Sequence, residues 1–394
     1  MRMLFTFAGG SGHLEPLVPL ARAAAARGHA VAFVGRPWMC PKVADLGFPV
    51  FPAGSDAGLT PQRRPLVAPD LEQELRVVGT GFGRRVARER AADLLPLCAA
   101  WQPDLLVCEE VDFGAMVVAE RLALPYATVL VIAAGGFIRP EYVAGPVNEV
   151  RADHNLPADP ELTMLDRYLV LSPFPSGYRN PGVQLPATAH AFRPLEPQPK
   201  AHAEPPWIAH PQQGPTVYFT LGTVFNVESG DLFQRVLAGL RGLPINLVVT
   251  VGRDIDPAEL GQHPSNVQIE RYIPQAALLP YCDLVISHGG SGSVIGALAH
   301  GLPMVLLPMG ADQPLNAQRC VALGVGEALD PLETTPHMVR EAVTRVLAGP
   351  AYRRAAERLR DEIAGLPEPA HAVQLLERLV VERRPLYAPA VRDL

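Results

Sequence analysis

The sequence predicts an α/β protein made of two halves, each a parallel β-sheet with helices on its faces. Short apolar runs alternate with helical patterns from residue 3 onward, and the same alternation starts again after residue 215. Strands that are joined through a helix pair in parallel, and the helices then cover the sheet faces. The chain has 394 residues, of which 48% are hydrophobic. This is enough apolar material for at least two domains of about 150 residues.

The first domain is predicted over residues 1–191. Its first strand ends in a glycine-rich turn at 9–12, and the helical pattern that follows stops at Gly28. The segments 54–83 and 135–181 mix proline and glycine, and we expect them to be irregular loops that shape a binding cleft. The predicted strands of this domain cover residues 3–8, 30–34, 104–108 and 126–132, with a further helix at 113–122.

A proline-rich stretch separates the two halves. Residues 192–215 cannot hold a helix interior or a central strand, and we predict an interdomain linker there. The second domain is predicted over residues 216–365. Residues 366–394 are expected to form a C-terminal helical segment that packs back on the first domain. The predicted strands of the second domain cover residues 217–221, 245–251, 267–269, 284–287 and 304–307.

Composition and charge exclude several classes of protein. A formal net charge of −6 argues against a dedicated nucleic-acid binder, which carries a basic face. The five cysteines form no Cys-x-x-Cys pair, so neither a zinc site nor a disulfide framework is indicated. The longest uncharged stretch, between Arg121 and Arg139, is interrupted by Pro125, Gly135 and Gly136 and is typical of a buried strand and loop. We expect a cytoplasmic protein with no nucleic-acid partner and no membrane span.

His13 is the first candidate for chemistry. It follows the glycine-rich turn at the carboxyl end of the first strand, and ligands bind at this edge of open parallel sheets. A dinucleotide fingerprint would need glycine at Glu15, so we interpret His13 as a catalytic imidazole that points into a cleft. The structural alternative is a histidine that only caps the following helix.

Three acidic residues follow the strand at 104–108, namely Glu109, Glu110 and Asp112. If this strand neighbours the first, one of these carboxylates can hold the His13 ring and stabilise its protonated form. The alternative is a solvated helix N-terminus, where acidic side chains are favoured by capping and by the helix dipole.

The strongest motif lies between residues 283 and 318. A buried strand ends at Ser287, and a loop of histidine, glycine and serine then opens a helix. Glycine lets the backbone approach a ligand closely, and serine hydroxyls with the free helix N–H groups form an anion site that suits phosphate. An acid–amide pair after a later strand can bond to sugar hydroxyls. The candidate positions at these strand ends are Thr223, His288, Gly290, Ser291, Gly292, Ser293, Asp312 and Gln313.

The segment from Tyr272-Ile273-Pro274-Gln275 through Asp312-Gln313 resembles the donor-binding signature of family 1 glycosyltransferases with the GT-B fold, nearest to the bacterial natural-product members. The resemblance implies two Rossmann-like parallel-sheet domains that face a cleft, with C-terminal helices closing the chain. It also implies inverting transfer from a nucleotide-diphosphate sugar, which is a co-substrate, so no bound cofactor is expected. No Asp-x-Asp motif stands at a suitable place, so no essential metal is expected.

The resemblance assigns roles to single residues of the donor site. Tyr272 stands where the family usually has a tryptophan that stacks on the base, and Gln275 where a glutamine lies close to the base and ribose. The contacts to the phosphates and the sugar are matched by Thr223, His288, Ser293, Asp312 and Gln313, with the loop amides.

On the acceptor side, the resemblance makes His13 the general base that removes a proton from an acceptor hydroxyl. Glu109 best matches the carboxylate that supports this base. The family usually has aspartate there, which leaves Glu110 and Asp112 open as alternatives.

The acceptor is expected to lie against the two irregular segments of the first domain. These contain Phe82, Phe137 and Tyr142, which suggest a large apolar acceptor such as a polyketide or flavonoid. The structural alternative is that these side chains only pack the loops. The sequence is compatible with a homodimer.

Gly296 bears on the choice of nucleotide. Plant members of the family often carry a glutamate here that grips both ribose hydroxyls, and glycine offers no such contact. If no side chain hydrogen-bonds to the 2′-hydroxyl, a ribonucleotide binds no more tightly than the deoxyribonucleotide that lacks this group. We therefore expect a TDP-sugar to bind at least as well as its UDP counterpart. The alternative is that another residue contacts the ribose and that Gly296 permits close helix packing.

Three other functions stay open from the sequence. A nucleotide-sugar epimerase of the same fold would convert the donor with no acceptor present. A lipid-acceptor transferase would show a basic and apolar surface stripe, for which residues 84–88 are a candidate. A non-enzymatic partner of a glycosyltransferase would need neither His13 nor the loop at His288.

Overall fold

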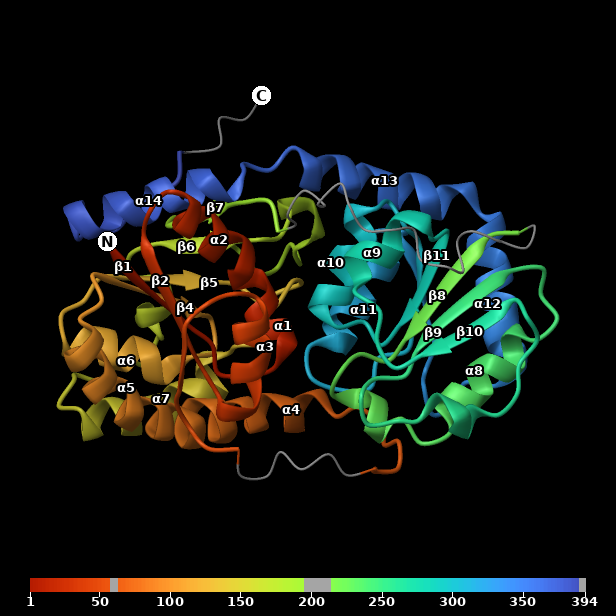
Figure 1. Cartoon of the computed structure of the whole chain (residues 1–394), viewed down its shortest axis with the longest axis horizontal. Coiled ribbons are helices and arrows are strands. Elements are labelled where there is room, and N and C mark those ends of the chain that lie inside the picture. The colour runs from red at the N-terminus through yellow and green to blue at the C-terminus, as the bar shows by residue number, and fades with distance from the viewer. Residues whose placement is uncertain (57–62, 195–213, 390–394) are drawn as a thin grey trace.

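The computed structural model of the protein describes residues 1–56, 63–194 and 214–389. The chain folds into two halves that lie side by side, each with a parallel β-sheet at its centre (Figure 1). The predicted α/β class with two parallel sheets is confirmed. The predicted linker falls mostly on residues 195–213, which lie outside the described residues.

The first half contains a seven-stranded parallel sheet in the order β3-β2-β1-β4-β5-β6-β7. Because β1 pairs with both β2 and β4, the strand order reverses at β1, and the loops after β1 and β4 lie next to each other. The strands are β1 Arg2–Thr6, β2 Ala30–Gly35, β3 Val50–Pro52, β4 Leu105–Glu109, β5 Tyr126–Val129, β6 Val170–Ser172 and β7 Ala189–Ala191.

Helices cover both faces of this sheet, so its strands are apolar and buried on both sides. One face presents Leu106 and Tyr126 to α5 and α6, and the other presents Phe5 and Leu105 to α2. The helices of this half are α1 Ser11–Leu14, α2 Val18–Ala26, α3 Cys40–Asp45, α4 Leu71–Val77, α5 Ala87–Trp101, α6 Phe113–Arg121 and α7 Pro140–Asp153, with a π-helix at Val78–Val86.

The two segments expected to be irregular contain helices, so that expectation is wrong for much of their length. The segment 54–83 contains α4 and most of the π-helix, and 135–181 contains α7. The prolines that suggested a loop at the second segment are compatible with α7. Pro140 is its first residue, where no N–H partner is needed, and Pro146 lies inside it.

The second half contains a six-stranded parallel sheet in the order β10-β9-β8-β11-β12-β13. Helices α8 and α12 pack on one face, while α10 and α13 pack on the other. The strands are β8 Thr216–Thr220, β9 Asn246–Thr250, β10 Val267–Glu270, β11 Leu284–Ser287, β12 Met304–Leu306 and β13 Gly326–Ala328. The helices are α8 Leu232–Leu240, α9 Gln275–Leu278, α10 Ser291–Ala299, α11 Gln313–Ala322, α12 Pro336–Ala348 and α13 Pro350–Ala364.

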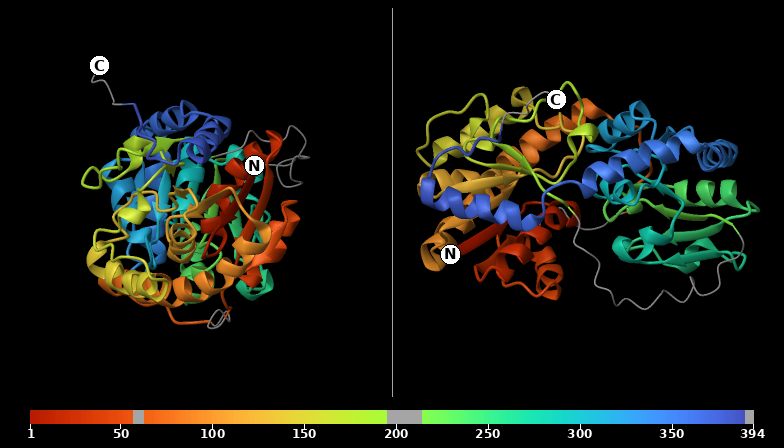
Figure 2. Two further views of the ribbon diagram at one scale, coloured as in Figure 1. Left: turned by 90° about the vertical axis from the view of Figure 1, so that its left-hand side faces the viewer. Right: turned by 90° about the horizontal axis from the view of Figure 1, so that it is seen from above.

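The chain returns to the first half at its C-terminal end. Helix α14, Pro369–Glu382, leaves the second half after α13 and packs along α2 (Figures 1 and 2). Its Leu375 and Leu379 are buried in the same core as Phe5, and its Glu377 pairs with Arg27 at 2.8 Å. The last helix therefore lies on the first half, to which it is anchored by both apolar and ionic contacts.

No helix in the described part of the chain is both long and apolar enough to cross a membrane. All five cysteines lie in this part and are free thiols, four of them buried.

Candidate active site

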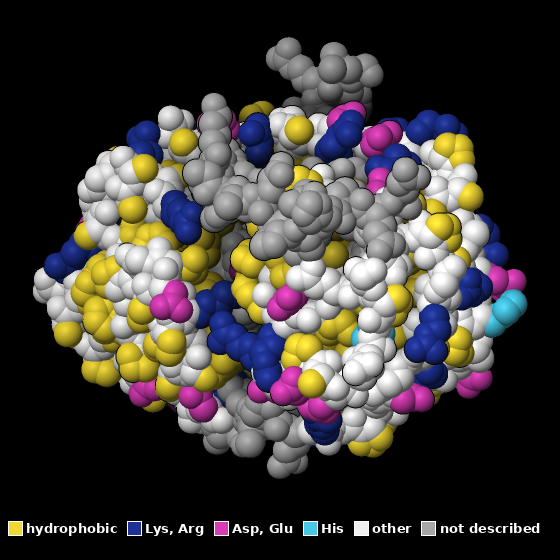
Figure 3. Space-filling view, turned by 45° about the vertical axis from the view of Figure 1, so that its right-hand side comes forward, with side chains coloured by type: hydrophobic (Ala, Val, Ile, Leu, Met, Phe, Trp, Pro, Cys, Tyr) yellow, Lys and Arg dark blue, Asp and Glu magenta, His cyan; other side chains and the backbone are white. Residues whose placement is uncertain are grey.

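The carboxyl ends of the two sheets face each other, and the loops that follow their strands meet. The amide of Ala133, in the loop after β5, donates to Oγ of Ser291 at the start of α10, with 2.8 Å between the atoms. A Cβ added at Gly292 would lie 3.9 Å from Oε2 of Glu15 in the first half. A space-filling view shows Lys and Arg side chains beside a hollow between the halves (Figure 3). Asp and Glu side chains lie next to them in the same view, so the rim of this hollow carries charges of both signs.

His13 lies within α1, directly after the turn that ends β1. Its ring folds back over the turn, since a Cβ added at Gly9 would lie 2.2 Å from the ring atom Cδ2. Glycine at position 9 is therefore required for the ring to occupy this place. The side chain remains 26% exposed, which leaves part of the ring open to the cleft.

Glu109 lies against this ring. Its Oε1 is 3.2 Å from Nδ1 of His13, and the Glu109 side chain is completely buried. The amide of Ala8 donates to Oε1 and the amide of Val111 donates to Oε2. Burial acts to lower the pKa of His13, but the carboxylates around the ring, with Glu109 first and Asp312 and Glu110 after it, outweigh burial and raise the pKa above its ordinary value of 6.5. The pair is arranged to accept a proton on His13 and to stabilise the resulting imidazolium.

The other two acids of the cluster have different partners. Asp112 caps α6 and forms an ion pair with Arg90, in which Nη2 lies 2.5 Å from Oδ2 and both side chains are completely buried. Oε1 of Glu110 accepts from the amides of Val131 and Ile132, each at 2.5 Å. Burial raises the pKa of Glu110 to about 7. Of the three open candidates, the geometry favours Glu109 as the partner of His13, while the carboxylate of Asp112 is held by Arg90 and by the amide of Ala115.

The three predicted acceptor residues occupy different surroundings. Phe82, in the π-helix, stacks on His13 with ring centroids 5.6 Å apart and 18° between the planes. Phe137 is buried in the loop before α7. Tyr142 packs on the core of the first half, and a Cβ added at Gly79 would lie 2.1 Å from its carbonyl oxygen. Only Phe82 is therefore in direct contact with the candidate base.

A cavity of about 350 Å³ lies on the sheet face beside β5 and β6. Most of the residues that line it are apolar, but Glu110, Glu161, Asp166 and Arg179 are charged. Apolar walls with a few polar groups are typical of small-molecule sites. The residues that line it include Glu110, Thr128, Leu130, Ile132, Phe137, Ile138, Leu162, Leu165, Val170, Arg179 and Leu185.

His288 lies at the end of β11, between two glycines. A Cβ at Gly222 would lie 2.6 Å from its Cε1, and a Cβ at Gly290 would lie 2.5 Å from its Nε2. Burial lowers the pKa of His288 to about 4, and its Nδ1 has no partner among the described residues. The ring is therefore neutral near pH 7 and can offer a hydrogen bond. The sequence had also allowed a positive charge here, which the burial of the ring disfavours.

Two of the predicted donor contacts are already engaged by protein atoms. Oγ of Ser291 donates to Oδ2 of Asp312 at 2.6 Å, so Ser291 is not free to bind phosphate as the sequence suggested. Oε1 of Gln313 accepts from the amides of Met309 and Gly310 and holds the turn before α11. Asp312 is partly exposed, and it is the member of the acid–amide pair that can reach a sugar.

The remaining donor residues come together at the start of α10. Nε2 of Gln275 lies 3.4 Å from Oγ of Ser293 and donates to it. Tyr272 is 54% exposed, so its ring is accessible for stacking on a nucleotide base. Thr223 is exposed in the loop after β8. Gly290 is the N-cap of α10. The first N–H groups of this helix have no partner within the helix and are directed out of its N-terminal end.

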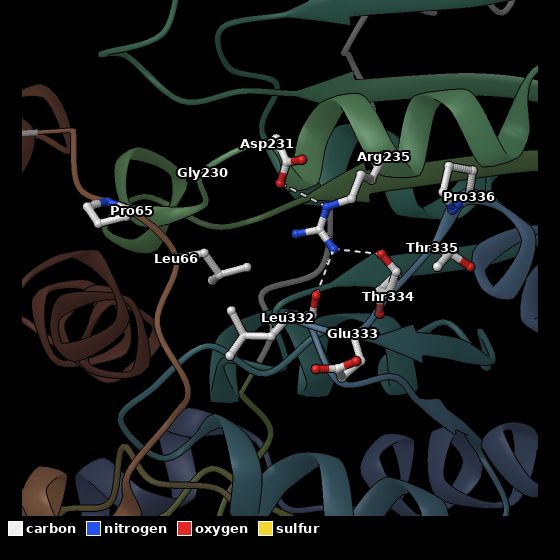
Figure 4. Close-up of a pocket in the computed structure, with 10 residues that line it drawn as sticks. All are labelled: Pro65, Leu66, Gly230, Asp231, Arg235, Leu332, Glu333, Thr334, Thr335 and Pro336. Carbon is white, nitrogen blue, oxygen red and sulfur yellow. Dashed lines mark hydrogen bonds and ion pairs between the residues drawn. The ribbon is translucent and has the colours of Figure 1, made fainter.

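A larger cavity of about 540 Å³ lies elsewhere, where the segment before α4 meets the second half (Figure 4). Arg235 crosses it, and its guanidinium is bound to Asp231 and to the carbonyls of Leu332 and Thr334. None of the predicted site residues lines this cavity, and its one cation is fully engaged. Within the described ranges, no group of three or more His, Cys, Asp or Glu side chains is arranged to hold a metal ion.

Sequence reasoning missed Asn316, which is completely buried in α11 and bonds to Asp312, to Gly289 and to the first half of the molecule. The available signal was its position four residues after Asp312, which places both side chains on one helix face. Arg90 was missed as well, since nothing in its local sequence distinguishes it from the exposed Arg85 and Arg88 just before it.

Comparisons with known proteins agree with this geometry. Residues 234–379 match the family model described as the C-terminal domain of erythromycin biosynthesis protein CIII-like proteins. The chain is 30% identical to 10-deoxymethynolide desosaminyltransferase of Streptomyces venezuelae over 98% of both chains. It is 28% identical to 3-alpha-mycarosylerythronolide B desosaminyl transferase of Saccharopolyspora erythraea, over 98% of this chain and 99% of the relative.

Among solved structures, the spinosyn rhamnosyltransferase SpnG superposes with a TM-score of 0.80 at 25% identity, over 96% of this chain and all of the other. SpnG has also been solved with spinosyn aglycone and with thymidine diphosphate. The likeness to these enzymes thus runs along nearly the whole chain, through both sheets and the helices that follow. With the site geometry, it shows that the chain is a glycosyltransferase that belongs to the bacterial natural-product members of family 1, which have the GT-B fold.

Proposed function

We propose that the protein moves a deoxy sugar from a TDP-sugar to a hydroxyl of an apolar natural-product acceptor, with inversion at the anomeric carbon. The observation that carries this proposal is the pairing of His13 with buried Glu109, on a cleft that α10 faces from the other half. The names of the two desosaminyltransferases and the complex of SpnG with thymidine diphosphate support the choice of donor.

In the proposed reaction, Glu109 engages Nδ1 of His13, which leaves Nε2 to take the proton of the acceptor hydroxyl. The acceptor oxygen bonds to the anomeric carbon as the bond from this carbon to the diphosphate oxygen breaks. The nucleoside diphosphate leaves with the electron pair of that bond, and attack from the opposite side inverts the configuration. General-base catalysis of this kind contributes about 10²–10⁴-fold in rate.

The leaving diphosphate gains negative charge in the transition state. The free N–H groups at the start of α10, in the loop from Gly290 to Ser293, can donate to it. His288 is neutral and can add a hydrogen bond. Donors that are fixed before the reaction stabilise this charge without reorganising, and their contribution can exceed that of the base.

The apolar body of the acceptor is proposed to lie against Phe82 and to reach the cavity lined by Phe137. Phe82 is stacked on His13, so a ring or macrocycle held on its free side would bring a hydroxyl close to the base. The 350 Å³ cavity offers further apolar surface beside Glu110. Both features suit a large apolar aglycone.

The lipid-acceptor alternative is not favoured by the surface of the first half. Arg84 pairs with Glu149 at 2.5 Å, and Arg88 pairs with Asp153 at 2.8 Å. The basic stretch at 84–88 is therefore a charge-balanced helix face and offers few unpaired cations to a lipid surface.

Replacing His13 tests the proposal. The variant His13→Ala is expected to bind TDP normally in calorimetric titration and to lose turnover by about 10²–10⁴-fold, the contribution of a general base. His29→Ala is the matched control, because His29 also pairs with a glutamate, Glu377 of α14 at 2.8 Å, but lies beyond the opposite end of α2 from His13. Its turnover should stay near that of the wild type.

Retained turnover in His13→Ala would contradict the role of the base. Conversion of the donor with no acceptor present would indicate an epimerase instead. The proton coupling constant at the anomeric carbon of the product distinguishes inversion from retention.

A further inference from the structure

Asn316 joins the two halves of the molecule at the candidate site. It lies in α11 and is completely buried. Its Nδ2 donates to Oδ2 of Asp312 at 2.8 Å and to the carbonyl of Gly289 at 2.9 Å. Its Oδ1 accepts from the amide of Ala134, in the first half, at 3.1 Å. One side chain therefore contacts the carboxylate of the donor site and the loop after β5 at the same time.

Ser291 makes a parallel connection. Its Oγ accepts from the amide of Ala133 at 2.8 Å and donates to Oδ2 of Asp312 at 2.6 Å. Two successive amides of the first half are thus held by two side chains of the second half, and both of these side chains converge on one carboxylate oxygen. The loop that supplies the amides continues into Phe137, which lines the 350 Å³ cavity.

A second set of contacts holds α11 in place against the first half. The hydroxyl of Tyr178 donates to the carbonyl of Asn316 at 3.2 Å. Arg319 donates to the carbonyls of Tyr178 and Gly177, each at 2.7 Å. These bonds fix the orientation of α11 against the first half. The direction in which the Asn316 side-chain amide points therefore depends on how the two halves are placed relative to each other.

We propose that Asn316 is a positioning residue that orients Asp312 toward the donor sugar only when the two halves are in contact. This inference rests on the proposed function and on the contact between Asp312 and the donor sugar that the family resemblance implies. Ser291 and Asn316 both bond to Oδ2, so Oδ1 is the oxygen that we assign to a sugar hydroxyl. When the halves separate, Asn316 loses the Ala134 amide and no longer holds the carboxylate in one orientation.

The consequence is a coupling between acceptor and donor. A molecule that orders the loop at Ala133 and Ala134 also orders Ser291 and Asn316, and through them Asp312. Buried networks of this kind fix a geometry when every member has its partners, and they lose it when one partner is removed. The donor sugar is therefore oriented for transfer only beside an ordered acceptor loop.

A double-mutant cycle with Asp312 tests the inference, because residues that act as a unit are not additive. Asn316→Ala is expected to lower kcat/KM for the TDP-sugar by about tenfold or more, as for the loss of a hydrogen bond to a charged group. In the Asp312→Ala background the same change should cost less than about twofold. Calorimetric affinity for TDP, which has no sugar, should be unchanged in Asn316→Ala, whereas affinity for the TDP-sugar falls.

Two further variants keep the test decisive. Asn316→Asp preserves volume and the acceptor for the Ala134 amide but places a second carboxylate against Asp312, so sugar transfer should fall even if Asn316→Ala does not fold. Asn266→Ala is the matched control, since Asn266 also donates to a backbone carbonyl, that of Ile245 at 2.8 Å, but lies just before β10 and away from Asp312. Its effect should be the same in both backgrounds.

The outcomes separate the two proposals. If Asp312→Ala lowers sugar transfer but the effects of Asn316→Ala and Asp312→Ala multiply, the positioning role is wrong and the sugar contact stands. If Asp312→Ala transfers sugar at the wild-type rate, the contact assigned between Asp312 and the donor sugar is wrong, and the positioning role of Asn316 is wrong with it. Weaker binding of TDP itself in Asn316→Ala would mean that Asn316 only supports the fold of the loop.

Discussion

Nδ1 of His13 lies 3.2 Å from Oε1 of Glu109, a carboxylate whose two oxygens also accept from the amides of Ala8 and Val111. These amides prevent the carboxylate from turning away from the ring. Burial acts to lower the pKa of His13, but Glu109, with smaller contributions from Asp312 and Glu110, raises it above 6.5. Because a general base acts only when it is neutral, this pair sets the lower pH limit of the proposed reaction.

Replacing Glu109 with glutamine should shift that limit. Without the carboxylate, burial lowers the pKa of His13, so the acidic limb of the kcat profile moves to lower pH. Turnover at pH 8 should fall by about 10²-fold, because the weaker base also loses the charge that stabilises its imidazolium. The measurement is kcat from pH 5 to 9 for Glu109→Gln and the wild type. An acidic limb at unchanged pH would mean that Glu109 does not act on the base.

Glu110 should make stability depend on pH. Burial raises its pKa from 4.5 to about 7, so the folded state binds this proton more tightly than the unfolded state. The stability that it contributes is complete below pH 4.5 and is lost as the pH rises through 7, by about 3 kcal/mol at most. Glu110→Gln keeps an acceptor for the amides of Val131 and Ile132 and should lack this loss.

Urea unfolding of Glu110→Gln and the wild type between pH 4.5 and 8 measures the effect. His288, whose pKa is lowered to about 4, titrates in the opposite sense, and its contribution is lost as the pH falls from 6.5 to 4. The two proteins are therefore compared at each pH. Parallel stability curves would show that Glu110 has the same pKa in the folded and the unfolded state.

The Arg90–Asp112 pair should be structural. Removing Arg90 as Arg90→Met leaves a buried and uncompensated carboxylate, which costs about 3–5 kcal/mol in the free energy of unfolding. Replacing both partners by apolar residues should recover much of this loss. In Asp112→Asn, turnover per folded molecule should stay near the wild-type value. An Asp112→Asn variant that is stable but has lost turnover would mean that Asp112 takes part in catalysis.

The nucleotide preference should favour thymidine diphosphate or show no preference. A Cβ added at Gly296 would lie 3.4 Å from Oε1 of Gln275, the side chain expected near the ribose, so position 296 is on the ribose side of α10 and offers no group to a 2′-hydroxyl. Calorimetric titration with TDP and UDP measures the difference. Tighter binding of UDP by more than about tenfold, or about 1.4 kcal/mol, would contradict the prediction.

Much of the fold could be predicted because its signals are local. The apolar runs at 3–8 and 284–287 fall on β1 and β11, and the glycine-rich turns after them hold His13 and His288. The helix in 135–181 was missed because Pro140 and Pro146 resemble loop residues, although α7 accommodates both. In 54–83 the misleading residues were the glycines at 79, 81 and 83, which lie in the π-helix.

The sequence by itself determined the two parallel sheets, the turns at their carboxyl edges and the family, since each depends on residues close together in the chain. Only the tertiary structure decided which acid holds His13, and that Ser291 and Gln313 are engaged by protein atoms. Glu109 is oriented by the amide of Ala8, 101 residues earlier, and Ser291 by the amide of Ala133. Every residue other than proline carries such an amide, so no sequence pattern marks the few that fold against a given side chain.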